Sequence, residues 1–189
     1  AQLGTADRLF SGAIDVGGGS ISNSGTIFGA VRAGSLLNAA SGNIVLRGSD
    51  AFQIDGNVTN NGVIDASDGA AGGIIGIGGD LAGNGVIKID TDFAAATTDR
   101  ITVGGNIVSG SNVSVDVTNL GGTIGNDSAP LLAQILTVDG TVAADSSYVV
   151  KAGLLEFEFD SAGGVLSAPV IKVADEVQVY TAAPVAVAS

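Results

Sequence analysis

A short phrase recurs along the first half of the chain: Asn or Gly, then Gly, then two residues that favour strands. It appears as Asn23-Ser24-Gly25-Thr26-Ile27, Asn60-Asn61-Gly62-Val63-Ile64 and Asn84-Gly85-Val86-Ile87. A sister phrase, Gly-Asn-aliphatic, adds Gly42 and Gly105. The marker glycines Gly25, Gly42, Gly62, Gly85 and Gly105 follow one another at intervals of 17, 20, 23 and 20 residues. An irregular period of about 20 residues is typical of solenoids and propeller-like arrays.

Turn chemistry explains the phrase. Asn and Gly tolerate positive φ, so they are expected to turn the chain sharply between short strands. The flanking Ile, Val and Thr residues then resume an extended backbone. Alternation of apolar and polar residues at 101–103, 113–117 and 155–159 predicts strands with one buried and one wet face. No window has a helical period, and 92–99 is predicted to be a loop.

Two all-β architectures are compatible with these turns. Asn-Gly between strands is also the signature of a β-hairpin, so an antiparallel sandwich stays open. The turns recur, however, without matched strand pairs on either side. This favours an all-β, parallel β-solenoid, in which short segments of similar character stack on one another.

The texture of the chain changes near residue 120. A Gly-rich loop is followed by the apolar run Leu131-Leu132-Ala133-Gln134-Ile135-Leu136 and then by strands around Tyr148 and Phe157. Because a solenoid needs an atypical end unit that recruits no further coil, we predict a C-terminal capping segment. The predicted organisation is β-solenoid coils at 1–119, a cap at 120–168 and a linker-like tail at 169–189.

Composition excludes several classes of protein. Gly occurs 30 times and aromatic residues make up 4% of the chain, which suits a narrow layered core of small aliphatic side chains. The net charge of −12 is expected to keep the protein soluble. The few basic residues form no patch for nucleic acid, and no stretch is apolar enough to span a bilayer. These basic residues are Arg8, Arg32, Arg47, Lys88, Arg100, Lys151 and Lys172.

The chain lacks His and Cys, so acyl-transfer triads and thiol chemistry are unavailable to it. A carboxylate pair for glycoside cleavage remains conceivable at Glu156 and Glu158, with Asp160 beyond. These residues alternate with apolar ones on a predicted strand, so a solvated strand face is the better interpretation. We therefore expect no enzyme activity.

Three aspartates, Asp90, Asp92 and Asp99, flank one predicted loop. Their oxygens could collect a structural calcium ion. The alternative is that they cap turns through their own backbone without a metal. We expect no cofactor, with structural calcium as the lesser alternative.

A family resemblance joins these motifs. Residues 57–168 resemble the C-terminal part of a Gram-negative autotransporter passenger, a pertactin-like β-helix with an autochaperone segment. The match runs through Asn61-Gly62-Val63-Ile64-Asp65, Thr98-Asp99-Arg100-Ile101-Thr102-Val103 and Pro130-Leu131-Leu132-Ala133-Gln134-Ile135. The tail up to Pro184 is similar to the linker that leads such passengers into their barrel. The resemblance implies a right-handed solenoid that is secreted and extracellular or displayed at the outer-membrane surface.

The expected function is that of an extracellular structural protein, either a stalk or a self-assembling fibre subunit. The alternative is an adhesin whose loops bind a host or matrix ligand. A solenoid ends in open strand edges that can template end-to-end addition, and the tail at 177–189 is uncharged. We therefore predict a homo-oligomer or head-to-tail polymer, with the tail as its clasp. The residues predicted for this contact are Val177, Val179, Tyr180, Pro184, Val185 and Val187.

Overall fold

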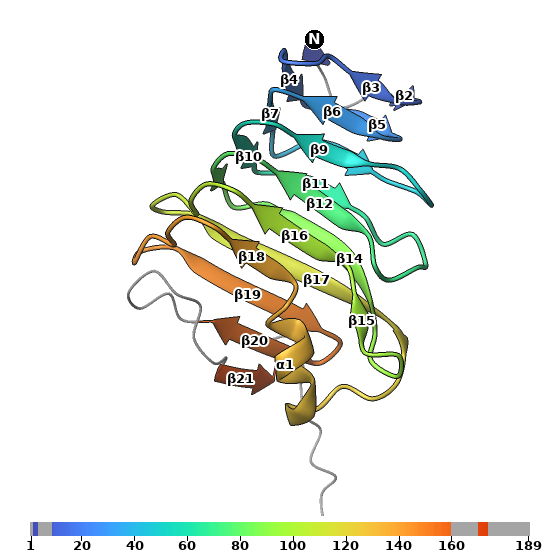
Figure 1. Ribbon diagram of the computed structural model, residues 1–189, viewed down its shortest axis with the longest axis vertical. Coiled ribbons are helices and arrows are strands. Elements are labelled where there is room, and N and C mark those ends of the chain that lie inside the picture. Colours follow the sequence, from blue (N-terminus) through green and yellow to red (C-terminus); the bar gives the residue numbers. More distant parts are fainter. Residues whose placement is uncertain (1, 4–8, 160–169, 174–189) are drawn as a thin grey trace, which may run out of the picture.

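The computed structural model describes residues 2–3, 9–159 and 170–173. In these residues the chain is all-β, with short strands arranged in parallel sheets (Figure 1). Helix is confined to one short stretch, the 3-10 turn η1 (Asn126–Ser128) and the single helical turn α1 (Ala129–Leu132). Within the described residues, no helix is long and apolar enough to cross a membrane.

The strands form three sheets, here called A, B and C. Sheet A contains β1 (Gln2–Leu3), β4 (Ser20–Asn23), β7 (Ser35–Asn38), β10 (Val58–Asn60) and β13 (Leu81–Ala82) in that order. Sheet B contains β2 (Leu9–Ser11), β5 (Thr26–Phe28), β8 (Asn43–Val45), β11 (Val63–Asp65), β14 (Val86–Asp92), β17 (Asn112–Gly121), β19 (Ser147–Ala152), β20 (Leu155–Phe159) and β21 (Val170–Val173), with β15 (Thr97–Thr98) beside β14. Sheet C contains β3 (Ile14–Asp15), β6 (Val31–Ala33), β9 (Phe52–Ile54), β12 (Ile74–Ile77), β16 (Arg100–Val103) and β18 (Leu136–Val138).

The chain visits the three sheets in a fixed order. From β4 to β14 each strand in A is followed by one in B, then one in C, and the chain then returns to A. We call one such passage a circuit. Each strand pairs in parallel with the strand of its own sheet one circuit later, and the circuits follow one another along the long axis (Figure 1). The antiparallel sandwich left open by the sequence is therefore wrong for these strands.

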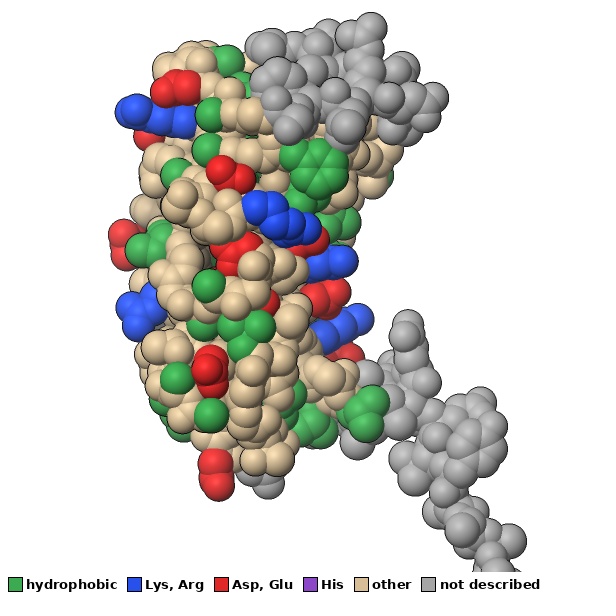
Figure 2. Space-filling view, turned by 90° about the vertical axis from the view of Figure 1, so that its right-hand side faces the viewer, with side chains coloured by type: hydrophobic (Ala, Val, Ile, Leu, Met, Phe, Trp, Pro, Cys, Tyr) green, Lys and Arg blue, Asp and Glu red, His purple; other side chains and the backbone are tan. Residues whose placement is uncertain are grey.

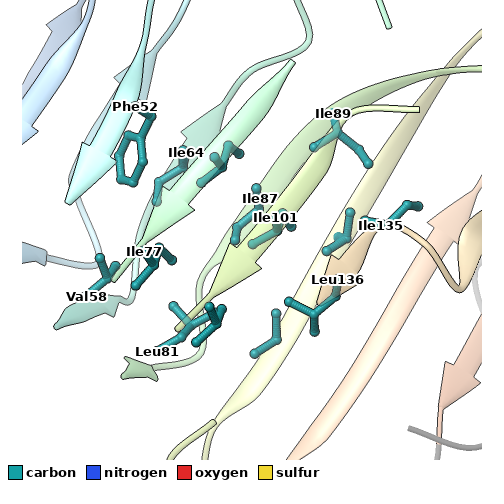
Figure 3. Packing of buried hydrophobic residues seen from close by; sticks show 14 of the residues in the cluster. Phe52, Val58, Ile64, Ile77, Leu81, Ile87, Ile89, Ile101, Ile135 and Leu136 are labelled. Carbon is teal, nitrogen blue, oxygen red and sulfur yellow. The ribbon is translucent and has the colours of Figure 1, made fainter. Parts of the chain in front are cut away.

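Equivalent side chains stack in columns inside the molecule. In sheet B the register places Ile27, Ile44, Ile64, Ile87 and Val115 above one another, and all five are buried. Sheets A and C supply matching columns, several of whose members appear in Figure 3. Each circuit thus buries a few small aliphatic side chains in one thin layer, as the composition predicted, and burial of this apolar surface is the main stabilising term.

The circuits are not equal in length. The intervals from Ile27 to Ile44, Ile64 and Ile87 are 17, 20 and 23 residues, and the next, to Val115, is 28. The longer interval contains a hairpin in which β15 folds back antiparallel on β14, with Thr91 opposite Thr98. The prediction of a loop at 92–99 was therefore incomplete, because this segment forms part of a sheet.

The C-terminal end of sheet B changes direction. β19 still pairs in parallel with β17, but β20 pairs antiparallel with β19, and β21 antiparallel with β20. Tyr148 lies against Phe159 with 4.9 Å between their ring centres. Leu132 of α1 is buried in the same core, although no helix was expected from the sequence. The proposed division of the chain at residues 119 and 168 stays a prediction.

Candidate functional site

Three buried asparagines stack where sheet A turns into sheet B. Asn23, Asn38 and Asn60 end successive strands β4, β7 and β10, and we call them the asparagine ladder. Asn23 Nδ2 donates to Asn38 Oδ1 at 2.9 Å, and Asn38 Nδ2 donates to Asn60 Oδ1 at 2.9 Å. Asn60 Nδ2 continues to the carbonyl oxygen of Val86 at 3.3 Å. Amide side chains suit this position because each one donates to the circuit below and accepts from the circuit above.

Two further rows of polar side chains join the circuits at the surface. In the first row, between sheets C and A, Asn57 Oδ1 accepts the Asp80 amide at 2.9 Å and Asp80 Oδ1 accepts the Asn106 amide at 2.8 Å. In the second row, after sheet A, Asn84 Oδ1 accepts the Asn112 amide at 3.0 Å. The Gly-Asn and Asn-Gly phrases of the sequence therefore supply hydrogen bonds between circuits, which the sequence interpretation did not include.

The marker glycines have a different purpose from the one expected. The Gly42, Gly62 and Gly85 residues stack, and a Cβ atom on Gly62 would collide with the carbonyl oxygen of Gly42. Their φ angles are not positive, so the expectation that they turn the chain through positive φ is wrong. Glycine is required there because the backbones of neighbouring circuits approach too closely for a side chain. Gly105 belongs to another turn, since it packs on Gly79.

Asp90 and Asp99 form a buried carboxylate cluster beside the 69–73 loop. Asp99 Oδ1 accepts the amides of Gly72 and Gly73 at 2.8 and 2.7 Å, and its Oδ2 accepts the amide of Asp90 at 2.8 Å. Asp90 Oδ2 accepts the Gly69 amide at 2.7 Å, whereas its Oδ1 is buried with no hydrogen-bond partner. Burial raises the pKa of both carboxyl groups, and these amide hydrogen bonds offset part of that rise.

The same contacts bear on the calcium alternative. Asp92 Oδ1 accepts the amides of Ala94 and Ala95, each at 2.9 Å, so Asp92 caps its own turn. Asp90 and Asp99 are engaged by backbone amides of the 69–73 loop. Within the described residues, no three acidic, His or Cys side chains are grouped so that they could hold a metal ion. The arrangement braces a loop, and it offers a cation no set of ligands.

The carboxylates considered for glycoside cleavage lie in a different setting. Glu156 on β20 faces Lys151 on β19, and Glu158 faces Val149. Asp160 lies outside the described residues. Glu156 therefore sits beside a cation on the outer face of sheet B, where both carboxylates are half-buried.

Glu156 belongs to a longer pattern that the sequence interpretation missed. The sheet B register places Asp65, Lys88, Asp116, Lys151 and Glu156 side by side on successive strands, so the signs alternate. Arg47 extends the row, because its guanidinium lies 3.9 Å from Asp65 Oδ1. We call these six residues the charge column, and Figure 2 shows acidic and basic side chains alternating down its right-hand side. Four of its members directly follow a buried aliphatic residue, a signal that becomes legible once the circuit lengths are known.

The outer face of sheet A carries a shallow open groove. Its polar wall is uncharged and includes several hydroxyl groups, with Leu37 as an exposed apolar member. Ser35 Oγ donates to Ser20 Oγ at 2.7 Å across two strands of this face. The groove is lined mainly by Ser20, Ser22, Ser35, Leu37, Asn57 and Thr59.

The predicted self-assembly residues, all within 177–189, lie outside the described residues. Comparison with known proteins gives one informative match. The chain is 32% identical over 151 residues to the uncharacterized protein YuaQ of Escherichia coli strain K12. The match covers 78% of this chain but 10% of YuaQ, so the chain spans about a tenth of the length of that relative. No family model and no solved structure matches the chain.

Proposed function

We propose that this chain is a right-handed parallel β-solenoid that acts as a structural stalk segment on a bacterial surface, as in an autotransporter passenger. The proposal rests above all on one observation: the polar side chains at the turns are committed to hydrogen bonds between circuits. Asn38, for example, bonds the circuits on both sides of it. A protein whose polar groups hold its own layers together is suited to a mechanical role rather than a catalytic one.

Two further observations support the stalk. The sheets pair in register from circuit to circuit, so rigidity extends along the whole stack without a central globular core. The similarity to one tenth of a much longer Escherichia coli protein agrees with a segment that is part of a long extended molecule. Handedness, secretion and display at the outer-membrane surface come from the family resemblance and belong to this proposal.

The solenoid can be tested by removing one whole circuit. Deletion of residues 43–62 brings Val63 into the place of Asn43, its register partner in the next circuit. A solenoid should then close over the gap and keep its circular dichroism spectrum, with reduced stability, because each repeat contacts mainly its neighbours. Deletion of residues 43–52 is the matched control, since it brings a sheet C segment into sheet B and should unfold the chain. Equal loss of structure in both variants would contradict the proposal.

Surface display is tested separately. An antibody raised against the chain should label intact bacteria that express the native gene. Labelling that requires permeabilised cells would contradict the extracellular location and leave the solenoid fold untouched.

Head-to-tail association through the tail remains part of the proposal. Removal of residues 177–189 should reduce the size of the particles that the chain forms in light scattering. Particles of unchanged size would show that the tail is not the clasp.

The groove on sheet A supports an adhesin as the second candidate. An uncharged surface rich in hydroxyl groups suits a neutral polar ligand such as a carbohydrate chain of a host or matrix. The labelled protein should then bind a subset of a glycan array, and Leu37→Asp should abolish this binding. Leu154→Asp is the control, because Leu154 is exposed at the β19–β20 turn, away from the groove residues. An array without bound glycans would exclude this candidate for carbohydrates.

A further inference from the structure

The charge column gives sheet B an outer face with a regular pattern of sign. In chain order its members are Arg47, Asp65, Lys88, Asp116, Lys151 and Glu156, so positive and negative charges alternate at six positions. Neighbouring strands lie about 4.8 Å apart, so the column is about 24 Å long. All six side chains are exposed or half-buried, and Lys151 is exposed.

The column is only loosely paired within the chain. Among its described members, the Arg47–Asp65 contact is the one ion pair within 4.0 Å, and it measures 3.9 Å. Lys88, Asp116, Lys151 and Glu156 are neighbours in the register without such a contact. Their charged groups are therefore available to a second surface that offers opposite charges at the same spacing.

An even, alternating column is complementary to itself when it is reversed. If a second copy faces the first across a two-fold axis at right angles to the column, between Lys88 and Asp116, position one meets position six. Arg47 then meets Glu156, Asp65 meets Lys151, and Lys88 meets Asp116. A parallel copy in the same register would place like charges together. A two-fold contact of this kind is isologous and closes as a dimer.

The residues beside the column obey the same symmetry. The register aligns Val63, Val86, Ser114 and Val149 as a second outward-facing column on the same strands. The two-fold axis places Val63 against Val149 and Val86 against Ser114. Small apolar groups therefore meet small or apolar groups, and no charge faces a valine.

We infer that the outer face of sheet B binds the same face of a second copy of this chain, in antiparallel orientation, through the charge column. This inference names a lateral partner for the proposed stalk, distinct from contact through the tail. The face is small, so the contact belongs to the weak class of interfaces and needs a high protein concentration. Many stalks held close together on one surface would supply such a concentration.

Two variants and their mixture test the inference. The acidic variant, Lys88→Gln with Lys151→Gln, leaves three carboxylates and Arg47 in the column. The basic variant, Asp65→Asn with Asp116→Asn and Glu156→Gln, leaves three cations. Each variant alone loses all three of its ion pairs with an identical copy. The mixture restores three of them: Asp65 with Lys151, Asp116 with Lys88, and Glu156 with Arg47.

The measurement is sedimentation equilibrium at physiological ionic strength, where the Debye length of about 8 Å screens the repulsion between two chains of net charge −12. We expect the wild-type chain to dimerise, each variant alone to associate at least tenfold more weakly, and the mixture to dimerise again. Circular dichroism of each variant establishes that it is folded. The control Arg32→Gln with Arg100→Gln has the same net charge as the acidic variant but alters sheet C, and it should dimerise like the wild type.

Three outcomes would overturn the inference. The first is a wild-type chain that stays monomeric at high concentration. The second is an acidic variant that associates as strongly as the wild type, and the third is a mixture as monomeric as its separate components. None of these outcomes affects the stalk proposal, because the circuit deletion tests the stack of circuits and the charge variants test only one of its outer faces.

Discussion

Replacement of Asn38 is the sharpest test of how the circuits are held together. Asn38 is fully buried in the middle of the asparagine ladder. Its Oδ1 accepts from Asn23 at 2.9 Å, and its Nδ2 donates to Asn60 at 2.9 Å and to the Val63 carbonyl oxygen at 3.1 Å. Asn38→Ala removes both ends of this connection and leaves the Asn23 amide and the Asn60 oxygen without their best partners.

The magnitude follows from these two buried groups. A buried polar group without a partner costs about 1–3 kcal/mol, so Asn38→Ala should lower the free energy of unfolding by about 2–6 kcal/mol. Asn60→Ala is the matched comparison at the end of the ladder. It leaves the Asn38 amide with the carbonyl oxygens of Val63 and Gly42 at 3.1 and 3.4 Å, and should cost about 1–2 kcal/mol.

An isosteric change separates hydrogen bonding from packing. Asn38→Asp keeps the shape but replaces the Nδ2 donor by an oxygen that faces the oxygens of Asn60 and Val63. Burial beside these oxygens should raise the pKa of the new carboxyl group in the folded state. Its stability should therefore be greatest at low pH and should fall as pH rises through that pKa.

Urea unfolding followed by circular dichroism measures all three variants, with the Asp variant repeated across acidic and neutral pH. If Asn38→Ala lies within about 0.5 kcal/mol of the wild type, or costs less than Asn60→Ala, the ladder does not hold the circuits together. A pH-independent loss in Asn38→Asp would refute the argument from opposed oxygens.

Three other substitutions have defined outcomes. Gly62→Ala should cost about 3 kcal/mol in urea unfolding, because its Cβ would collide with the carbonyl oxygens of the preceding circuit, whereas Gly18→Ala has open space and should change stability by less than about 0.5 kcal/mol; equal effects would contradict the close-approach argument. The raised pKa of Asp90 means that the folded chain holds a proton to higher pH than its ordinary value of 3.8, so stability falls as pH rises through the raised pKa. Asp90→Asn should therefore narrow the difference between urea midpoints at acidic and neutral pH, and an unchanged difference would exclude Asp90 as its source. Tyr148→Phe should raise the thermal midpoint, since the buried hydroxyl has no partner and burial raises its pKa, while the ring contact is kept; a lowered midpoint would indicate a hydrogen bond that the hydroxyl makes.

Local patterns were sufficient for part of the fold. Alternation around Ile64 and Val115 identified strands, and it assigned the correct residues to the interior, because a side chain in a strand faces opposite to its neighbours. The hairpin at 91–98 and the turn α1 were missed for the same reason. Each is short, and each is stabilised by burial of residues such as Thr98 and Leu132 rather than by a local period.

The candidate sites depended more on tertiary structure. The three aspartates near 90–99 were recognised from the sequence, but their role was not, since the amides that engage Asp90 and Asp99 come from the 69–73 loop. Likewise, Glu156 was assigned to a solvated strand face, whereas its position opposite Lys151 depends on the antiparallel return of β20.

The recurring Asn and Gly phrase by itself determined that short strands alternate with turns, and the intervals between Gly25, Gly42, Gly62 and Gly85 are the true lengths of the circuits. Why those residues are required was decided only by the tertiary structure. The glycines are needed because backbones one circuit apart nearly touch, and the asparagines because they bond to the next circuit. Such contacts join residues about one circuit apart in the sequence, and the irregular lengths of the circuits hide this pairing until the strands are in register.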